Sequence, residues 1–124
     1  LSRTMRSGQA RVANAWADSV IASGQPNVLI VGDLNDYPRR KRNPTLTPLV
    51  ENDKLEFLTA GMTSCRDRNW SLIDHVVASK AATQRLIEGS QRTENLYEFL
   101  NEDEVDGVSD HCPVVVRFST LEIP

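Results

Sequence analysis

Long apolar runs are missing from this chain, and so is an excess of positive charge. No apolar stretch in the 124 residues approaches the roughly 20 that a membrane-spanning helix needs. The formal net charge is −3. Proteins that hold nucleic acid by charge alone are usually basic, so the composition argues against a general nucleic-acid-binding module. An enzyme that meets phosphates through a metal ion does not need such an excess.

Cysteine is also scarce. Cys65 and Cys112 are too few to build a disulfide framework. We expect two buried thiols, with one disulfide between them as the alternative. The cysteine content therefore does not indicate the cellular compartment of the protein. The length suits one domain with one core. Because the chain starts at Leu1 rather than at a methionine, we expect it to be processed, truncated or cut from something longer.

Hydrophobic spacing predicts an α/β fold: a mixed β-sheet with flanking helices. Small and apolar residues recur at three- and four-residue steps over Ser7–Ser23, which predicts an amphipathic helix, and Gly24 is expected to end it. A helix followed by a buried strand is typical of α/β proteins. The helical stripe comprises Ala10, Ala13, Trp16, Ala17, Val20 and Ile21. Strands of one sheet are predicted at Val28–Val31, Ile73–Ala78 and Pro113–Phe118, and a loop-rich acidic segment at Asn95–Asp110.

Polar side chains interrupt three of the apolar strings. VLIVGDLND ends at Asp36, LIDHVV surrounds Asp74, and SDHCPVVV begins at Ser109. An unpaired charge is expensive to bury, so core strands normally exclude such residues. We therefore expect the ends of these strands to converge on one polar site.

The first string places a carboxylate and an amide two residues apart. In extended geometry Asp33 and Asn35 point the same way. The carboxylate can hold a metal ion or take a proton from water, and the amide can donate to a developing oxyanion. The alternative is that Asp33 and Asn35 only shape a turn.

The other two strings contain both histidines of the chain. Period two puts Asp74 on the opposite strand face from His75, which we interpret as a packed, hydrogen-bonded histidine. His111 is then the partner that a strand carboxylate needs, and a histidine oriented by an aspartate can stabilise an oxyanion or move a proton. Asp110 can ligate Mg²⁺. The alternative is an Asp-His pair with no role beyond starting a strand.

Together the strings resemble the endonuclease/exonuclease/phosphatase superfamily. GDLND is similar to its GDxN motif, LIDHVVAS to its IDxxxxS strand, and SDHCPV to its SDHxPV motif. The resemblance implies that Asp33 activates the attacking water and that Asn35 binds a phosphoryl oxygen. It implies that Asp74 orients His111, which contacts the scissile phosphate. Asp110 and Asp33 would hold the cofactor, Mg²⁺ or Mn²⁺.

The resemblance covers residues 1–124 but only the C-terminal half of the family's domain. That domain is a four-layer α/β/β/α sandwich whose first half supplies a glutamate ligand, an asparagine and a second catalytic histidine. The segment Leu1–Val31 holds no histidine and no glutamate. The chain as given therefore lacks a metal ligand and a histidine that the resemblance calls for.

These features predict a fragment of a divalent-metal-dependent phosphoesterase, a nuclease that hydrolyses phosphodiester bonds. The substrate is expected to be a phosphate ester, namely nucleic acid. A sugar- or lipid-phosphate phosphatase of the same superfamily is one alternative, and a non-catalytic binding or assembly module is another. The sheet face opposite the helix is expected to be apolar and to be covered by a second copy, as a homodimer, or by the missing N-terminal half.

Two further features allow two interpretations each. The run Arg39–Arg42 is interpreted as a solvated loop, and contact with phosphates that flank the reacting one is the alternative. Trp70 is interpreted as a partly buried core residue, and stacking on a base or sugar is the alternative.

Overall fold

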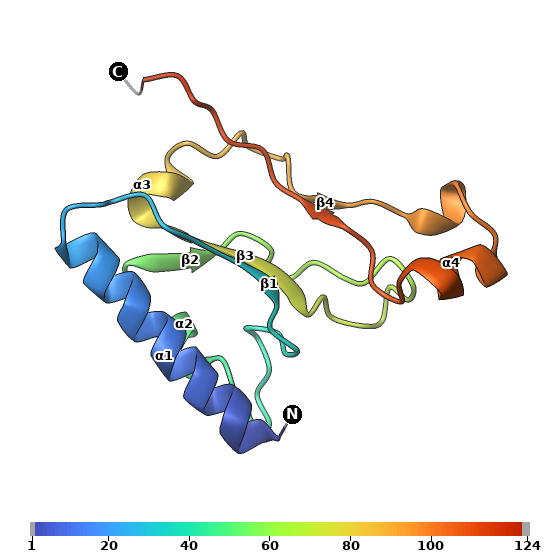
Figure 1. The fold of residues 1–124 in the computed structure, drawn as a ribbon, viewed down its shortest axis with the longest axis horizontal. Coiled ribbons are helices and arrows are strands. Elements are labelled where there is room, and N and C mark those ends of the chain that lie inside the picture. Colours follow the sequence, from blue (N-terminus) through green and yellow to red (C-terminus); the bar gives the residue numbers. More distant parts are fainter. Residues whose placement is uncertain (1, 123–124) are drawn as a thin grey trace.

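The structure is a computed structural model that describes residues 2–122. A three-stranded sheet lies between α1 on one side and a pair of C-terminal strands on the other, with α4 at one end of the molecule (Figure 1). This pair of strands, at residues 92–93 and 114–115, is called the C-terminal hairpin. In chain order the elements are α1 (Arg3–Ala22), β1 (Leu29–Asp33), α2 (Thr47–Val50), β2 (Leu55–Phe57), β3 (Asp74–Ser79), α3 (Lys80–Thr83), β4 (Arg92–Thr93), the 3₁₀-helix η1 (Leu96–Glu98), α4 (Glu102–Val108) and β5 (Val114–Val115).

Helix α1 is longer than the sequence predicted. It begins at Arg3 rather than Ser7, because the Ser2 side chain accepts a hydrogen bond from the backbone N–H of Met5 and caps the helix. Gly24 follows the helix with a φ of +104°, the left-handed conformation expected of it. The helix buries small residues, Ala10 and Ala17, against Leu46, Leu49, Leu55 and Val77.

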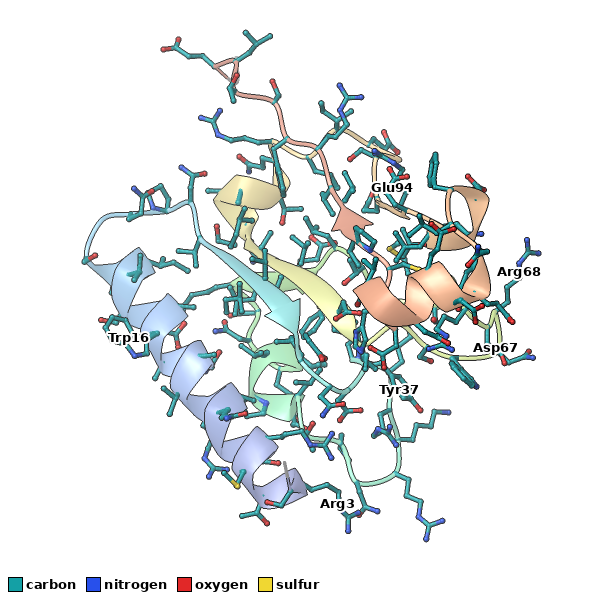
Figure 2. All side chains as sticks on the ribbon, turned by 45° about the vertical axis from the view of Figure 1, so that its right-hand side comes forward. Arg3, Trp16, Tyr37, Asp67, Arg68 and Glu94 are labelled. Carbon is teal, nitrogen blue, oxygen red and sulfur yellow. A yellow bond between two sulfur atoms is a disulfide. The ribbon has the colours of Figure 1, made fainter. Side chains whose placement is uncertain are left out.

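One member of the predicted apolar stripe does not pack. Trp16 is 69% exposed, and Figure 2 shows it pointing away from the body of the molecule. Alanines on the inner side let the helix lie close to the sheet, which leaves no room there for an indole ring.

The main sheet has the strand order β1-β3-β2, and both pairings are antiparallel. The prediction of one mixed sheet that also contains Pro113–Phe118 is wrong. Within residues 2–122 this segment pairs with β4 in a separate two-stranded antiparallel sheet. Its apolar side chains Val116 and Phe118 pack on the face of β3, beside Val76 and Ala78, instead of extending the edge of the sheet.

Strand β3 is consequently buried on both faces. His75 and Val77 lie on the side of α1, whereas Asp74 and Val76 lie on the side of the C-terminal hairpin. This is the division of faces that the two-residue period predicted. A central position explains why the strand is apolar over almost its whole length.

The hairpin covers the second sheet face only in part. On β1, which is an edge strand, Leu29 is 48% and Val31 is 65% exposed. The homodimer, or the missing half that would cover this face, stays a prediction. None of the helices in the described part of the chain has the length and apolar character needed to cross a bilayer.

The segment Asn95–Asp110 is more ordered than predicted. It contains η1 and α4, and α4 starts with a capping box in which Asn101 and Glu104 each bond the other's backbone N–H. The acidic residues of this segment gather in the first turn of α4, where negative charge is favoured by the helix dipole.

Candidate active site

The pairing of β1 with β3 sets two carboxylates directly opposite each other. In the register of the two strands Asp33 is the partner of Asp74. They share the sheet face of Val31 and Val76, at the end of β1 and the beginning of β3. Like charges directly across two strands repel. The pair therefore favours a positive group beside it, either a protonated histidine or a cation.

His111 supplies such a group. Its Nδ1 donates to the Asp74 carboxylate, at 3.0 Å from Oδ1 and 2.8 Å from Oδ2, so the predicted hydrogen bond between these residues is confirmed. The backbone N–H of His111 donates to Ser109 Oγ, which fixes the turn after α4. The hydrogen bond to Asp74 raises the pKa of His111, although partial burial acts in the opposite direction. Because Nδ1 is engaged, Nε2 is the ring atom left for a substrate.

Asp110 lies beside this ring but is not drawn into the pair. Its Oδ1 is 3.8 Å from Nε2 of His111, and its side chain is 75% exposed. The structure instead groups Asp33, Asp74 and His111, whose potential ligand atoms all lie within 4.8 Å of one another. The metal-binding roles predicted for Asp110 and Asp33 remain predictions, and Asp74 joins them as a possible ligand.

The group of Asp33, Asp74 and His111 could hold a metal ion. Two facing carboxylates offer hard oxygen ligands and carry more negative charge than the single proton of His111 balances. His111 Nδ1 cannot bond a cation while it donates to Asp74. The oxygens of Asp33 and Asp74, which Mg²⁺ or Mn²⁺ prefers to nitrogen, therefore fit the cation better than the imidazole does.

Asn35 is held by a turn rather than by the strand. Strand β1 ends at Asp33, and Asn35 has a φ of +55°. The Asn35 backbone N–H donates to Asp33 Oδ1 at 2.8 Å, and its carbonyl accepts from Nη1 of Arg6 at 2.6 Å. The premise that Asp33 and Asn35 share one extended strand is wrong, because the chain leaves β geometry after Asp33. Asn35 lines a cavity of about 150 Å³ beside α1 together with Asp33, and it is not among the residues that line the two clefts at Asp74 and His111.

His75 is the packed histidine that the sequence predicted. It is 2% exposed, and burial lowers its pKa despite the neighbouring carboxylates. Nε2 lies 2.8 Å from the carbonyl oxygen of Asp36, which can only accept, so Nε2 carries the proton. Nδ1 then accepts from the Thr59 hydroxyl at 2.7 Å. Phe57 packs edge-on against the ring. His75 is therefore a neutral structural group with one fixed tautomer.

Asp36 is an important residue that the sequence analysis did not identify. It is 1% exposed, yet it accepts hydrogen bonds from the backbone N–H groups of Tyr37 and Thr45, the Thr45 hydroxyl and Nε of Arg40. Burial alone would raise the pKa of Asp36, but the hydrogen bonds, with those from Thr45 and Arg40 foremost, lower it. An aspartate that precedes a proline-rich loop is a common turn initiator, and this signal could have found it.

Two clefts meet at the Asp74–His111 pair. One of about 270 Å³ is lined by this pair, Arg66 and Trp70, among others. The other, of about 410 Å³, extends over Asp33 and the exposed face of β1. Trp70 is 57% exposed, so its interpretation as a core residue is wrong. The pair is thus open to a substrate from two sides, and one side presents an aromatic ring and a cation.

A disulfide joins the walls of the first cleft. Cys65 and Cys112 are bonded, with Cα atoms 6.3 Å apart, and the expectation of two free thiols is wrong. Cys112 directly follows His111, whereas Cys65 belongs to the loop that carries Trp70. The bridge therefore fixes the histidine segment against that loop.

No protein family model matches the chain, and no curated protein matches its sequence.

Proposed function

We propose that this chain is the C-terminal half of a four-layer phosphoesterase domain of the endonuclease/exonuclease/phosphatase type, and that the complete domain hydrolyses phosphodiester bonds in nucleic acid with a divalent metal ion. The observation that carries the proposal is the Asp74–His111 pair, which faces Asp33 across two strands at the meeting of two open clefts.

His111, Asp74 and Asp33 have different charges, and each charge suits a different role in the reaction. The raised pKa of His111 favours the imidazolium, which can donate from Nε2 to a phosphoryl oxygen as negative charge develops there. Asp74 orients the ring and balances its charge. Asp33 is exposed and accepts only a backbone N–H, so a carboxylate oxygen is left to take a proton from water. A bound Mg²⁺ or Mn²⁺ would polarise the phosphoryl oxygens.

The second half of the site would come from a part of the protein that precedes this chain. The chain has no histidine besides His75 and His111, and His75 is committed to Asp36 and Thr59. A glutamate ligand and a second histidine must then be supplied from elsewhere for the full reaction. The exposed apolar residues of β1, Leu29 and Val31, offer a surface on which that half could pack.

The environment of the pair favours a nuclease over a phosphatase for small esters. Trp70 and Arg66 line the same cleft as His111. An exposed indole beside a cation suits a base or sugar next to a phosphate, and base stacking on an aromatic ring is worth about 1–3 kcal/mol. A small phosphomonoester would need neither side chain.

The test is a comparison of two substrate classes with the full-length protein. We expect Mg²⁺-dependent cleavage of plasmid DNA or RNA, abolished by EDTA, and little hydrolysis of p-nitrophenyl phosphate. His111→Ala should lower turnover at least about 10²–10³-fold, since one oxyanion donor is worth that much. Asp53→Asn, at an exposed position with no recorded side-chain hydrogen bond in the described chain, is the control.

Two results would contradict the proposal. Faster hydrolysis of the phosphomonoester than of nucleic acid would indicate the phosphatase. Cleavage of neither substrate, together with no Mg²⁺ or Mn²⁺ binding in titration calorimetry, would indicate a non-catalytic module. His111→Ala that retains full turnover would remove the assigned role of the Asp74–His111 pair whatever the substrate.

A further inference from the structure

Four consecutive cations stand out in a chain whose net charge is negative. Residues Arg39–Arg42 are all basic and all exposed, whereas the formal net charge is −3. Mutual repulsion disfavours a compact arrangement of such a run, and runs of this kind are commonly flexible. The conformation of this loop is nevertheless fixed by the rest of the protein.

The buried carboxylate of Asp36 organises the loop from inside. It bonds both ends of the segment, Tyr37 at the start and Thr45 at the end, through their backbone N–H groups. It also pairs with Arg40, whose guanidinium lies 4.7 Å from the centre of the Tyr37 ring. Of the four cations, Arg40 is thus the one that serves the loop itself.

The other three cations are available to a partner. Within residues 2–122, Arg39, Lys41 and Arg42 form no ion pair with a carboxylate. Arg39 lies over Gly61, so closely that a Cβ atom at that glycine would come within 2.5 Å of Arg39 Nη1. No carboxylate of the described residues neutralises its charge there.

The base of the loop is attached to the candidate active site. The carbonyl of Asp36 accepts the His75 Nε2–H, and His75 is next to Asp74 in β3. Arg39 lines a small cavity together with Ser71 and Leu72, and those two residues also line the cleft of the Asp74–His111 pair. Figure 2 shows Tyr37, at the start of the loop, near the end of the sheet that carries the candidate active site.

We propose that Arg39, Lys41 and Arg42 bind the phosphate backbone of a nucleic-acid strand whose reacting phosphate lies at the Asp74–His111 pair. This inference rests on the proposed function, because that function places a phosphodiester at the pair. Phosphate contacts of this kind position a strand without reading its sequence. They also supply locally the positive charge that the whole chain lacks.

A nucleic acid fits this loop better than an anionic membrane. Amphipathic segments that insert into membranes combine cations with exposed large apolar side chains that enter the lipid. The exposed large apolar residues of the described chain include Val31 and Val50 but none in the loop 37–45. Tyr37 is covered by Arg40. Trp70, an exposed aromatic ring in the cleft of the pair, suits the bases of a strand.

The experiment measures binding without cleavage. The chain is titrated into a fluorescein-labelled single-stranded oligonucleotide in EDTA, and anisotropy is followed at several salt concentrations. For single strands log K changes with log salt by about −0.7 per phosphate neutralised, so Lys41→Ala/Arg42→Ala should make the slope shallower by about 1.4. At 50 mM salt we expect affinity to fall by at least about tenfold.

The matched control removes the same charge at the other end of the sheet. Lys80→Ala/Arg117→Ala alters two exposed cations, one of which directly follows the end of β3 remote from Asp74. It should leave the slope unchanged. Circular dichroism of both double variants should match the parent, since within residues 2–122 none of the four side chains forms a hydrogen bond or an ion pair.

The outcomes separate this proposal from the proposed function. An equal loss in both double variants would overturn it in favour of a nonspecific charge effect, and no loss in either would overturn it outright. Binding to vesicles that contain phosphatidylserine, with none to the oligonucleotide, would assign the loop to a membrane. Loop-dependent binding in a full-length protein that cleaves nothing would contradict the proposed function but keep the loop as a nucleic-acid site. Cleavage at an unchanged rate in Lys41→Ala/Arg42→Ala would contradict the role of the loop and keep the proposed function.

Discussion

Replacement of Asp36 by asparagine tests whether one buried carboxylate holds the loop 37–45 and the base of the site together. The substitution keeps the shape of the side chain but turns one acceptor oxygen into an NH₂ donor. In the protein, Oδ2 of Asp36 accepts from the backbone N–H of Thr45 at 3.0 Å and from its hydroxyl at 2.6 Å. Oδ1 accepts from the backbone N–H of Tyr37 at 2.9 Å and from Arg40.

The size of the effect follows from these contacts. Whichever way the amide of Asp36→Asn turns, its NH₂ group faces a backbone N–H, that of Thr45 or that of Tyr37. Thr45 is 2% exposed, so a donor lost there has no water to replace the acceptor. A buried donor without an acceptor costs about 1–3 kcal/mol, and the hydrogen bonds to the charged carboxylate add to this. We expect about 2–4 kcal/mol of lost stability, a large share of the roughly 5–15 kcal/mol typical of a domain.

Urea unfolding followed by circular dichroism measures this loss. A loss of this size should lower the midpoint by about 1–2 M urea, whereas Asp53→Asn should leave it unchanged. The pH dependence gives an independent check. Because the folded pKa of Asp36 is lowered, its contribution is present above the unfolded value of about 3.9 and is lost as pH falls through the folded pKa. The difference between parent and variant should therefore shrink below about pH 4. Equal midpoints for Asp36→Asn and Asp53→Asn at neutral pH would refute the reasoning.

Two further predictions concern the Asp74–His111 pair and the disulfide. In Asp74→Asn the pKa of His111 should fall toward about 6.5, as measured by NMR titration of the ring protons, because the hydrogen bond to the carboxylate is the main cause of its raised value. The stability that this bond gives the parent is present below about pH 6.5 and is lost as pH rises through the folded pKa of His111. A variant in which His111 titrates as it does in the parent would contradict the assigned hydrogen bond. Cys65→Ser/Cys112→Ser should cost about 4 kcal/mol in urea unfolding, since the bridge closes a sequence separation of 47 residues. Unchanged stability, or no effect of dithiothreitol on the parent, would show that the bridge does not form.

The sequence predicted well wherever a local period decided the structure. The alternation along β3 correctly separated His75 from Asp74, because successive side chains of a strand must point to opposite faces. It also left His111 as the partner of Asp74, which the structure confirms. The start of α1 was less predictable, since the Ser2 cap lies about two turns before the apolar stripe begins at Ala10.

Features that depend on packing between distant segments were beyond the sequence. A strand pattern such as Pro113–Phe118 shows that a segment is extended, but not whether it pairs with an edge or crosses a face. Trp16 and Trp70 are both exposed although both were expected to pack, because burial depends on the shape of the opposing surface. The pairing of Cys65 with Cys112 likewise required the loop of Trp70 to lie against the segment of His111.

The two histidines show how one strand can hold a structural and a chemical group side by side. On the inner face, burial lowers the pKa of His75, and the carbonyl of Asp36 fixes its neutral tautomer. On the outer face, the Asp74 carboxylate raises the pKa of His111 and keeps a proton on the ring. Because His75 and Asp74 are adjacent in β3, the contact that anchors the basic loop and the contact that orients His111 are joined by a single peptide bond. Under the proposed function, a strand bound at Arg39, Lys41 and Arg42 and a phosphate at the Asp74–His111 pair would thus be held through two adjacent residues of β3.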